Sequence, residues 1–501
     1  MNTQRTRFRS IVLALAGASV LAACTVGPDY KRPDAVTAAT YKELDGSGWK
    51  TAEPADAHIR SAWWEVYNDP ALNALEQQVA SANQNVAAAQ ARFRAARSQV
   101  AQFRSQFFPV VTANGGYSRA RSSENVKFKS TAGKTLDDWI VGADATWEPD
   151  LWGRVSRSVE GARANAQASA ADAQSALLSM QAELATDYFE LRGIDREQQL
   201  LNDTITAYKE AVELTQNRYK GGIATDADVA QAQTQLRTTQ AQSIDLGVQR
   251  AQLEHAIAIL IGQTPSTFSL PVAPLVAVPV IAPVGVPSSL LERRPDIASA
   301  ERHVVNLNAQ IGVATAAYFP NLILSATGGL EATNFSDWLL APARFWSLGP
   351  SIAGTLLDFG GRAAQKAEAQ ANYDEGVAQY RQTVLTAFGQ VEDNIAALRV
   401  LEQEAQAQDD AVSAAQRSLA IVSNRYKNGA ITYLDVVVAQ TTALTNEREA
   451  VSIARRRMAA SVALVKALGG GWDTTSLPTD EQLTHPDEAV QPASAPGASR
   501  G

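Results

Sequence analysis

Residues 217–233 read NRYKGGIATDADVAQAQ, and residues 424–440 read NRYKNGAITYLDVVVAQ. The two stretches are identical at 10 of 17 positions, all at a constant offset of 207 residues. Unrelated segments of this length share far less. The chain therefore contains a duplicated unit, and the fold of one copy predicts the fold of the other.

Further matches extend the duplication along the chain. DLWGR at 150–154 corresponds to DFGGR at 358–362, the Phe-Pro pair at 108–109 corresponds to that at 319–320, and Gly262 corresponds to Gly469. Because the period is too long for a solenoid repeat, two copies indicate one subunit with internal pseudo-twofold symmetry. The predicted organisation is a signal peptide 1–23, an N-terminal segment 24–69, a first repeat 70–264, a Pro/Val-rich linker 265–289, a second repeat 290–472 and a disordered tail 473–501.

Each repeat contains the same predicted elements. One helix precedes the Phe-Pro pair, at about 70–107 and 296–318, and two strands follow it. The next stretches, 154–219 and 362–427, are rich in Ala, Gln, Glu and Leu and contain no proline, which predicts very long helices. At 1.5 Å per residue such a helix spans about 100 Å. A glycine turn then leads into a second long helix, 226–261 and 433–468, and coiled-coil packing buries the apolar faces.

The N-terminus has the features of a bacterial export signal. Three arginines precede a short apolar core, and the sequence LAAC at 21–24 resembles a lipobox. The implied mature chain begins at Cys24, the only cysteine, with acyl chains attached to it. An ordinary signal peptide with an incidental cysteine is the alternative. By analogy with lipoprotein sorting, an Asp directly after the cysteine would favour the inner membrane, and Thr25 at this position favours the outer one.

Composition excludes several classes of function. Removing residues 1–23, which carry three arginines and no acidic residue, lowers the net charge from −8 to −11. An acidic chain without a basic stripe argues against a nucleic-acid partner. The four histidines are scattered without metal-ligand spacing, and we find no phosphate loop or nucleophile motif. The sequence therefore predicts neither an enzyme nor a cofactor other than the lipid on Cys24.

Four segments alternate between apolar and polar residues. In 139–147 the odd positions are apolar and begin and end with Trp139 and Trp147; 346–356 begins with Trp346, and 322–330 and 111–117 alternate likewise. Short alternating strands with terminal aromatics are typical of a transmembrane β-barrel, although a half-buried soluble sheet has the same period. Four strands cannot close a barrel, so several copies must pool them; a dimer would give eight strands and a trimer twelve.

These residues resemble the TolC-like outer-membrane efflux factors, in particular their lipidated OprM/NodT-type branch. The resemblance rests on CTVGPDYKRP at 24–33, LLERRPDIASAE at 290–301 and the two RYKxG turns. It implies a mainly α fold with a membrane β-barrel portion, in which a homotrimer forms a 12-stranded barrel and a periplasmic α-barrel. It also implies a periplasmic adaptor, an inner-membrane pump of the RND type, and efflux of small molecules such as drugs. A protein-secretion duct and a non-conducting envelope lipoprotein remain alternatives.

The two helix reversals are the predicted site. Gly222 and Gly429 fit left-handed positions after a helix, and Thr225 and Thr432 fit N-caps of the returning helices, with Asp228 and Asp435 three residues on, as in a capping box. The resemblance gives Asp435 a second role, as an acidic ring that gates the closed periplasmic end; Val438 replaces a further acid present in some family members. It also places the tips at the adaptor, through Lys220, Gly222, Lys427 and Gly429. Plain turn chemistry is the alternative for these tip residues.

Overall fold

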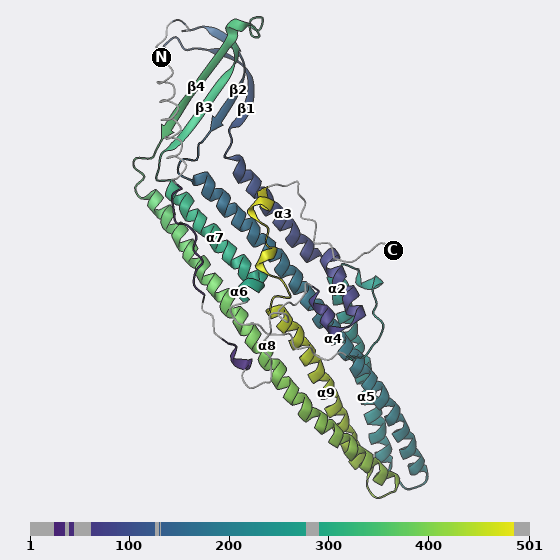
Figure 1. The fold of residues 1–501 in the computed structure, drawn as a ribbon. Helices are drawn as coiled ribbons and strands as arrows, with labels where there is room; N and C mark the ends of the chain where they lie inside the picture. The colour runs from purple at the N-terminus through teal and green to yellow at the C-terminus, as the bar shows by residue number, and fades with distance from the viewer. Residues whose placement is uncertain are drawn as a thin grey trace, which may run out of the picture.

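The computed structural model describes residues 25–35, 40–44, 62–125, 130, 132–276 and 290–484. These residues form an elongated subunit, with a sheet at one end and two helical hairpins that extend to the other end (Figure 1). The predicted signal peptide 1–23 and Cys24 lie outside the described residues, so the lipobox stays a prediction.

The elements follow the duplication. The main elements of the first half are α2 (Pro70–Ala82), α3 (Gln84–Ser105), β1 (Val110–Arg121), β2 (Thr135–Trp147), α4 (Arg154–Lys220) and α5 (Asp226–Leu260). Those of the second half are α6 (Leu290–Arg293), α7 (Pro295–Ala316), β3 (Asn321–Ala332), β4 (Arg344–Ala353), α8 (Gly361–Lys427), α9 (Tyr433–Ala467) and α10 (Asp480–Thr484). Short 3-10 turns include η1 (Lys42–Leu44), η2 (Trp63–Tyr67), η3 (Pro265–Thr267), η5 (Ala341–Ala343) and η6 (Thr474–Ser476).

The prediction of two long helical hairpins is confirmed. Helices α4 and α8 each contain 67 residues, and α5 and α9 each contain 35. α4 packs against α5 and α7, α8 packs against α9 and α7, and α4 also packs against α9, which joins the two hairpins. None of the described helices combines the length and the hydropathy needed to cross a membrane.

The helix expected over 70–107 is two helices, because Asn83 interrupts it. Asn83 has an extended backbone, and its side-chain oxygen accepts hydrogen bonds from the backbone N–H groups of Asn85 and Val86, which begin α3. Its amide nitrogen donates to the carbonyl of Leu260 at 2.8 Å. An asparagine in such a sequence does not reveal a break, since the contact with α5 that fixes it is tertiary.

The four strands form one antiparallel sheet in the order β1-β2-β3-β4. The register aligns the predicted apolar positions across all four strands: one row contains Val111, Ala145, Ala326 and Leu348. Successive residues of a strand point to opposite faces, so the rows with this parity make one continuous apolar face. Val111 is 67% exposed and Leu348 is 72% exposed, so no other part of the described chain covers that face.

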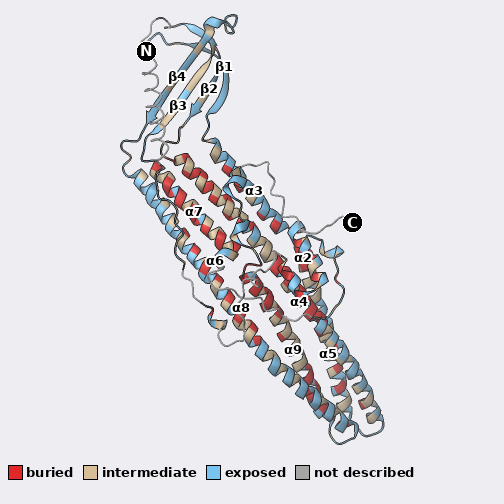
Figure 2. Ribbon diagram, viewed as in Figure 1, coloured by how far each residue is buried: buried red, intermediate tan, exposed pale blue. Residues whose placement is uncertain are grey.

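The buried core lies entirely in the helical part. Figure 2 shows buried residues along the helices, whereas the strands contain only intermediate and exposed residues. The largest cluster joins η2 to α4 through aromatic contacts, in which the rings of Tyr67 and Phe189 lie 4.9 Å apart, edge to face. None of the described residues outside the sheet therefore buries its apolar face.

Part of the tail that was predicted to be disordered is ordered in the structure. Residues 474–476 form η6, and α10 packs against α3 and α4, where Leu483 is buried beside Val100. The guanidinium of Arg104 donates to the carbonyl of Thr484 at 2.7 Å. The prediction of disorder is wrong for residues 473–484. It rested on the polar composition of the tail, which does not show that one apolar residue, Leu483, is buried against α3 and α4. The rest of the tail lies outside the described residues.

Burial of a carboxyl group gives a prediction of pH dependence. Glu76 on α2 is fully buried, and neither carboxyl oxygen has a hydrogen-bond partner among the described residues. Burial raises the pKa of Glu76 to about 9, well above the ordinary value of 4.5. The native state then keeps a proton that the unfolded chain releases, so the free energy of unfolding falls as pH rises between those values.

We therefore expect Glu76→Gln to unfold at a higher temperature than the unmodified protein at pH 8, and at a similar temperature at pH 4. Each pH unit in this window changes the free energy of unfolding by at most about 1.4 kcal/mol. Circular dichroism melts from pH 4 to pH 9 measure the effect. Equal melting temperatures at pH 8 would contradict it.

Candidate functional site

Each hairpin has a turn of the same type between its two helices, and both turns lie at the end of the molecule farthest from the sheet (Figure 1). Gly222 has φ +72° and Gly429 has φ +78°, a backbone conformation that glycine adopts readily. The N–H of Ile223 donates to the carbonyl of Arg218 at 2.8 Å, and that of Gly222 donates to the carbonyl of Tyr219 at 2.9 Å. These two bonds satisfy carbonyls at the end of α4 and make a Schellman turn.

Capping boxes begin both returning helices. Thr225 accepts a hydrogen bond from the N–H of Asp228 at 3.2 Å, and the Asp228 carboxylate accepts one from the N–H of Thr225 at 2.8 Å. Thr432 and Asp435 form the same reciprocal pair at the start of α9, with 3.2 Å from the Thr432 N–H to the Asp435 carboxylate. Asp228 is half-buried, whereas Asp435 is exposed. The remaining tip residues singled out from the sequence are also exposed: Lys220, Gly222, Lys427 and Gly429.

An arginine joins the two tips, and sequence reasoning missed it. The Arg218 guanidinium lies over the ring of Tyr426, 4.7 Å from its centroid, and donates to the carbonyls of Tyr426 and Lys427 at 3.0 and 3.1 Å. The Tyr426 hydroxyl donates to Thr215 at 3.3 Å. The repeated Arg-Tyr pair was the available signal, but only the packed hairpins show which repeat supplies the arginine.

Polar side chains lie on the face of the sheet opposite its apolar face. Thr112, Asp144, Thr327 and Ser347 form a row across the four strands. The Asp144 carboxylate accepts hydrogen bonds from the amide of Asn114 and from the hydroxyl of Thr327, the latter at 2.7 Å. Asp144 thus links strands of the first repeat to a strand of the second. The sheet has one polar and one apolar face, as its alternation predicts.

Aromatic residues lie at both ends of the apolar face. Toward the strand-connecting loops, Trp139 packs against Tyr117 at 4.3 Å and Phe335 at 4.9 Å between ring centroids. Trp346 is the third residue of β4 and is 80% exposed; its register partner Gly328 pairs with Ala143, midway between Trp139 and Trp147 along β2. Toward the helices, the Trp147 indole donates to the carbonyl of Phe107 at 2.9 Å. Aromatic rings at two levels suit the two polar–apolar boundaries of a membrane.

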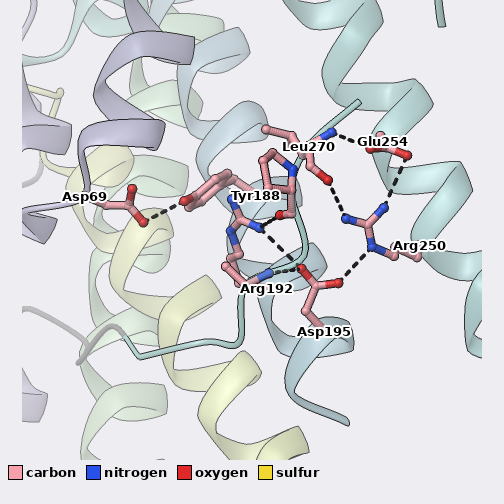
Figure 3. A network of polar contacts seen from close by, with 9 residues as sticks. Asp69, Tyr188, Arg192, Asp195, Arg250, Glu254 and Leu270 are labelled. Carbon is pink, nitrogen blue, oxygen red and sulfur yellow. Dashed lines mark hydrogen bonds and ion pairs between the residues drawn. The ribbon is translucent and has the colours of Figure 1, made fainter. Parts of the chain in front are cut away.

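A buried polar network fastens the segment that leaves α5 (Figure 3). Asp195 on α4 is 1% exposed and accepts hydrogen bonds from Arg192 at 3.3 Å, from Arg250 at 2.8 Å and from the N–H of Ala273 at 3.0 Å. Arg250 also donates to the carbonyl of Leu270 at 2.7 Å. The network ties α4 and α5 to the start of the inter-repeat linker, a role that spacing alone did not reveal.

The same network continues on both sides. Glu254 accepts the N–H of Leu270 and lies 3.3 Å from Arg250. On the other side, the Tyr188 hydroxyl donates to Asp69, the N-cap of α2, at 2.7 Å. Every carboxylate in Figure 3 therefore has a donor, as expected of a structural network. The described residues include no group of three or more His, Cys, Asp or Glu side chains placed to hold a metal.

A sequence model described as outer membrane efflux protein matches residues 75–263 and 286–470, which span both repeats. The chain belongs to the outer membrane efflux protein family. It is accordingly an outer-membrane component of an efflux pump that extends into the periplasm, and not an enzyme.

Individual relatives are similar to this protein along most of its length. The efflux family includes the toluene efflux pump outer membrane protein TtgC of Pseudomonas putida, 29% identical over 93% of this chain and 96% of its own length. The pyoverdine export outer membrane protein OpmQ of Pseudomonas aeruginosa is 29% identical over 85% of this chain and 91% of its own length. The solved outer-membrane channel OprN superposes with a TM-score of 0.84 at 31% identity, over 90% of this chain and 100% of that one. The predicted mainly α fold is confirmed, and the four predicted strands form a small sheet, whereas the trimer and its 12-stranded barrel stay predictions.

Proposed function

We propose that three copies of this efflux protein form the exit duct through which a pump expels small molecules. The observation that carries the proposal is the sheet, whose outermost strands β1 and β4 each have one edge that no described residue pairs with. An unpaired edge is not tolerated in lipid, so neighbouring copies must supply the missing partners. Three copies of four strands give a 12-stranded barrel, with the aromatic ends of the apolar face at the two membrane boundaries.

The polar face then lines the duct. Asp144 and its partners Asn114 and Thr327 would face water in the barrel, which agrees with their exposed or intermediate positions. The helical hairpins continue the duct into the periplasm over about 100 Å, the length of a 67-residue helix. Such a duct needs no resident cofactor.

Membrane attachment and partners complete the proposal. Acyl chains on Cys24 would anchor each copy, and mass spectrometry of the mature N-terminus tests this. The exposed tips, with Lys220 and Lys427 beside Gly222 and Gly429, would meet a periplasmic adaptor that connects to an inner-membrane pump of the RND type. Relatives named for toluene efflux and for pyoverdine export support small molecules as the cargo.

Asp435 is the proposed gate residue. It caps α9 through one carboxylate oxygen, yet it is exposed at the tip, where three copies around an axis would bring three carboxylates together. A ring of like charge in a narrow pore favours cations and makes the passage sensitive to substitution. Asp228 has the same capping geometry but is half-buried, so it provides a matched control.

We expect trimers of the unmodified protein to conduct ions in planar bilayers, and Asp435→Ala to raise single-channel conductance and lower cation selectivity. Asp228→Ala removes an equivalent capping box and should leave both properties nearly unchanged. Equal effects of the two substitutions would assign Asp435 to capping alone. Intact trimers that do not conduct would exclude the duct and favour a structural envelope lipoprotein.

A further inference from the structure

The contact between the two tips of one chain is only half of a symmetric pair. Arg218, at the end of α4 in the first repeat, lies over Tyr426 at the end of α8 in the second repeat. At the repeat offset of 207, Arg218 corresponds to Arg425, and Tyr219 corresponds to Tyr426. The reverse contact, from Arg425 to Tyr219, is absent from the described part of a single chain.

The two unused residues are both available at the surface. Tyr219 is 48% exposed, whereas its counterpart Tyr426 is 5% exposed beneath the Arg218 guanidinium. Arg425 is exposed, whereas its counterpart Arg218 is half-buried. The same Arg-Tyr pair is therefore buried in one combination and left open in the other.

We propose that Arg425 of each subunit lies over the ring of the partner subunit's Tyr219, so that arginine–tyrosine contacts alternate within and between chains around the ring of tips. By the same correspondence, Arg425 donates to the backbone carbonyls at the end of the neighbouring α4. The inference rests on the proposed assembly into a closed ring, and it identifies the residues that join neighbouring copies at the tip.

The helix faces beside the tips support this pairing. Within one chain α4 packs against α9, so the repeat symmetry pairs α8 with α5 of a neighbouring copy. Leu214 on α4 packs into the tip cluster with Tyr426 and Tyr433, whereas its counterpart on α8, Ile421, is 52% exposed. A second copy would cover Ile421 as this chain covers Leu214.

The residues midway along the helices are complementary as well. Arg455 on α9 pairs with Glu190 on α4 within the chain. Their repeat counterparts are Val248 on α5, which is 57% exposed, and Ala397 on α8. An ion pair within the chain is thus replaced by two apolar residues where copies would meet. Neither position would leave an unpaired charge in the interface, which is the costly outcome of mismatched pairing.

The partner is a second copy of this chain, and the contact chemistry is a cation over an aromatic ring with hydrogen bonds to helix-terminal carbonyls. Both terms favour the same geometry, since a guanidinium attracts the ring face and complements the negative end of the helix. This combination explains why each repeat carries arginine directly before tyrosine, even though one chain uses only one residue from each pair.

Cysteine cross-linking tests the contact in the full-length protein. A chain with Arg425→Cys and Tyr219→Cys, treated with a short bismaleimide, is expected to give covalent dimers and trimers on denaturing gels. The matched pair Arg218→Cys with Tyr426→Cys should be cross-linked within one chain and migrate as a monomer. A control variant combines Arg425→Cys with Lys209→Cys, which lies further along α4 from the tip, and keeps Tyr219. This variant should give no oligomeric bands.

Native mass spectrometry of the untreated samples separates the two levels of the inference. If the variants are trimers but the Arg425–Tyr219 pair yields only monomers, the proposed contact is wrong while the duct proposal stands. If the unmodified protein itself is not trimeric, the proposed assembly fails. Equal cross-linking through Lys209→Cys would also overturn the contact, because it would show proximity without the predicted register.

Discussion

Replacing Gly469 by alanine is expected to lower the free energy of unfolding by at least about 3 kcal/mol, and to abolish accumulation of the mature protein. Gly469 follows α9 with φ +95°, a conformation in which an L-residue is strained. A Cβ atom there would lie 2.0 Å from the carbonyl oxygen of Arg293, the last residue of α6. A backbone atom cannot rotate away, so the two elements would have to separate.

Gly222→Ala is the matched control for this prediction. Gly222 has a similar positive φ of +72°, but a Cβ atom would meet nothing within 4 Å. Its substitution should cost only the backbone strain, about 1 kcal/mol. Denaturant unfolding of both variants measures the difference. Similar losses for Gly469→Ala and Gly222→Ala would contradict a role for the close approach to Arg293.

The repeat supplies an independent check of the same reasoning. Gly262, the counterpart of Gly469, has φ +71°, and a Cβ atom there would lie 2.4 Å from the carbonyl oxygen of Ala82. Ala82 ends α2 as Arg293 ends α6. In both repeats the returning helix therefore ends against the carbonyl end of a helix from the start of that repeat, and only glycine permits the approach.

Asp195→Ala is expected to destabilise the subunit by about 3–5 kcal/mol, the cost of leaving a buried charge, that of Arg192, without its ion-pair partner. The substitution leaves the buried Arg192 without a carboxylate, removes one of the acceptors of Arg250, which keeps Glu254, and frees the N–H of Ala273. Because these donors hold the segment after α5 in place, limited proteolysis should cut that segment sooner than in the unmodified protein.

The second repeat again contains the control. The counterpart of Asp195 is Glu402, which is exposed on α8. Glu402→Ala removes a carboxylate at the equivalent position without leaving a buried cation unpaired, so the change should stay within about 0.5 kcal/mol. If Glu402→Ala were as damaging as Asp195→Ala, burial of the network could not be the cause.

Local patterns predicted most of the architecture. Long stretches without proline identified α4 and α8 almost to the residue, and the Thr-x-x-Asp spacing identified the start of α5 and α9, since capping involves residues only three apart. Alternation identified the strands and their apolar face, because side chains change face at every residue. Each of these properties depends on neighbours in the sequence.

Other features were missed because distant segments determine them. The break at Asn83 depends on the carbonyl of Leu260, and the packing of α10 depends on an apolar site that α3 and α4 form together. Arg218 and Asp195 look like ordinary surface charges until their helices are packed. No local pattern distinguishes a buried, paired charge from a solvated one.

The sequence by itself determined that this efflux protein is a duplicated chain of two helical hairpins and four amphipathic strands. Repetition, periodicity and capping can be recognised from the order of the residues along the chain. Only the tertiary structure decided how the copies differ. Packing of α4 on α9 places Arg218 over Tyr426 and leaves Arg425 and Tyr219 exposed, although their sequences match. Identical residues take different roles because each role depends on which surface the chain itself has covered.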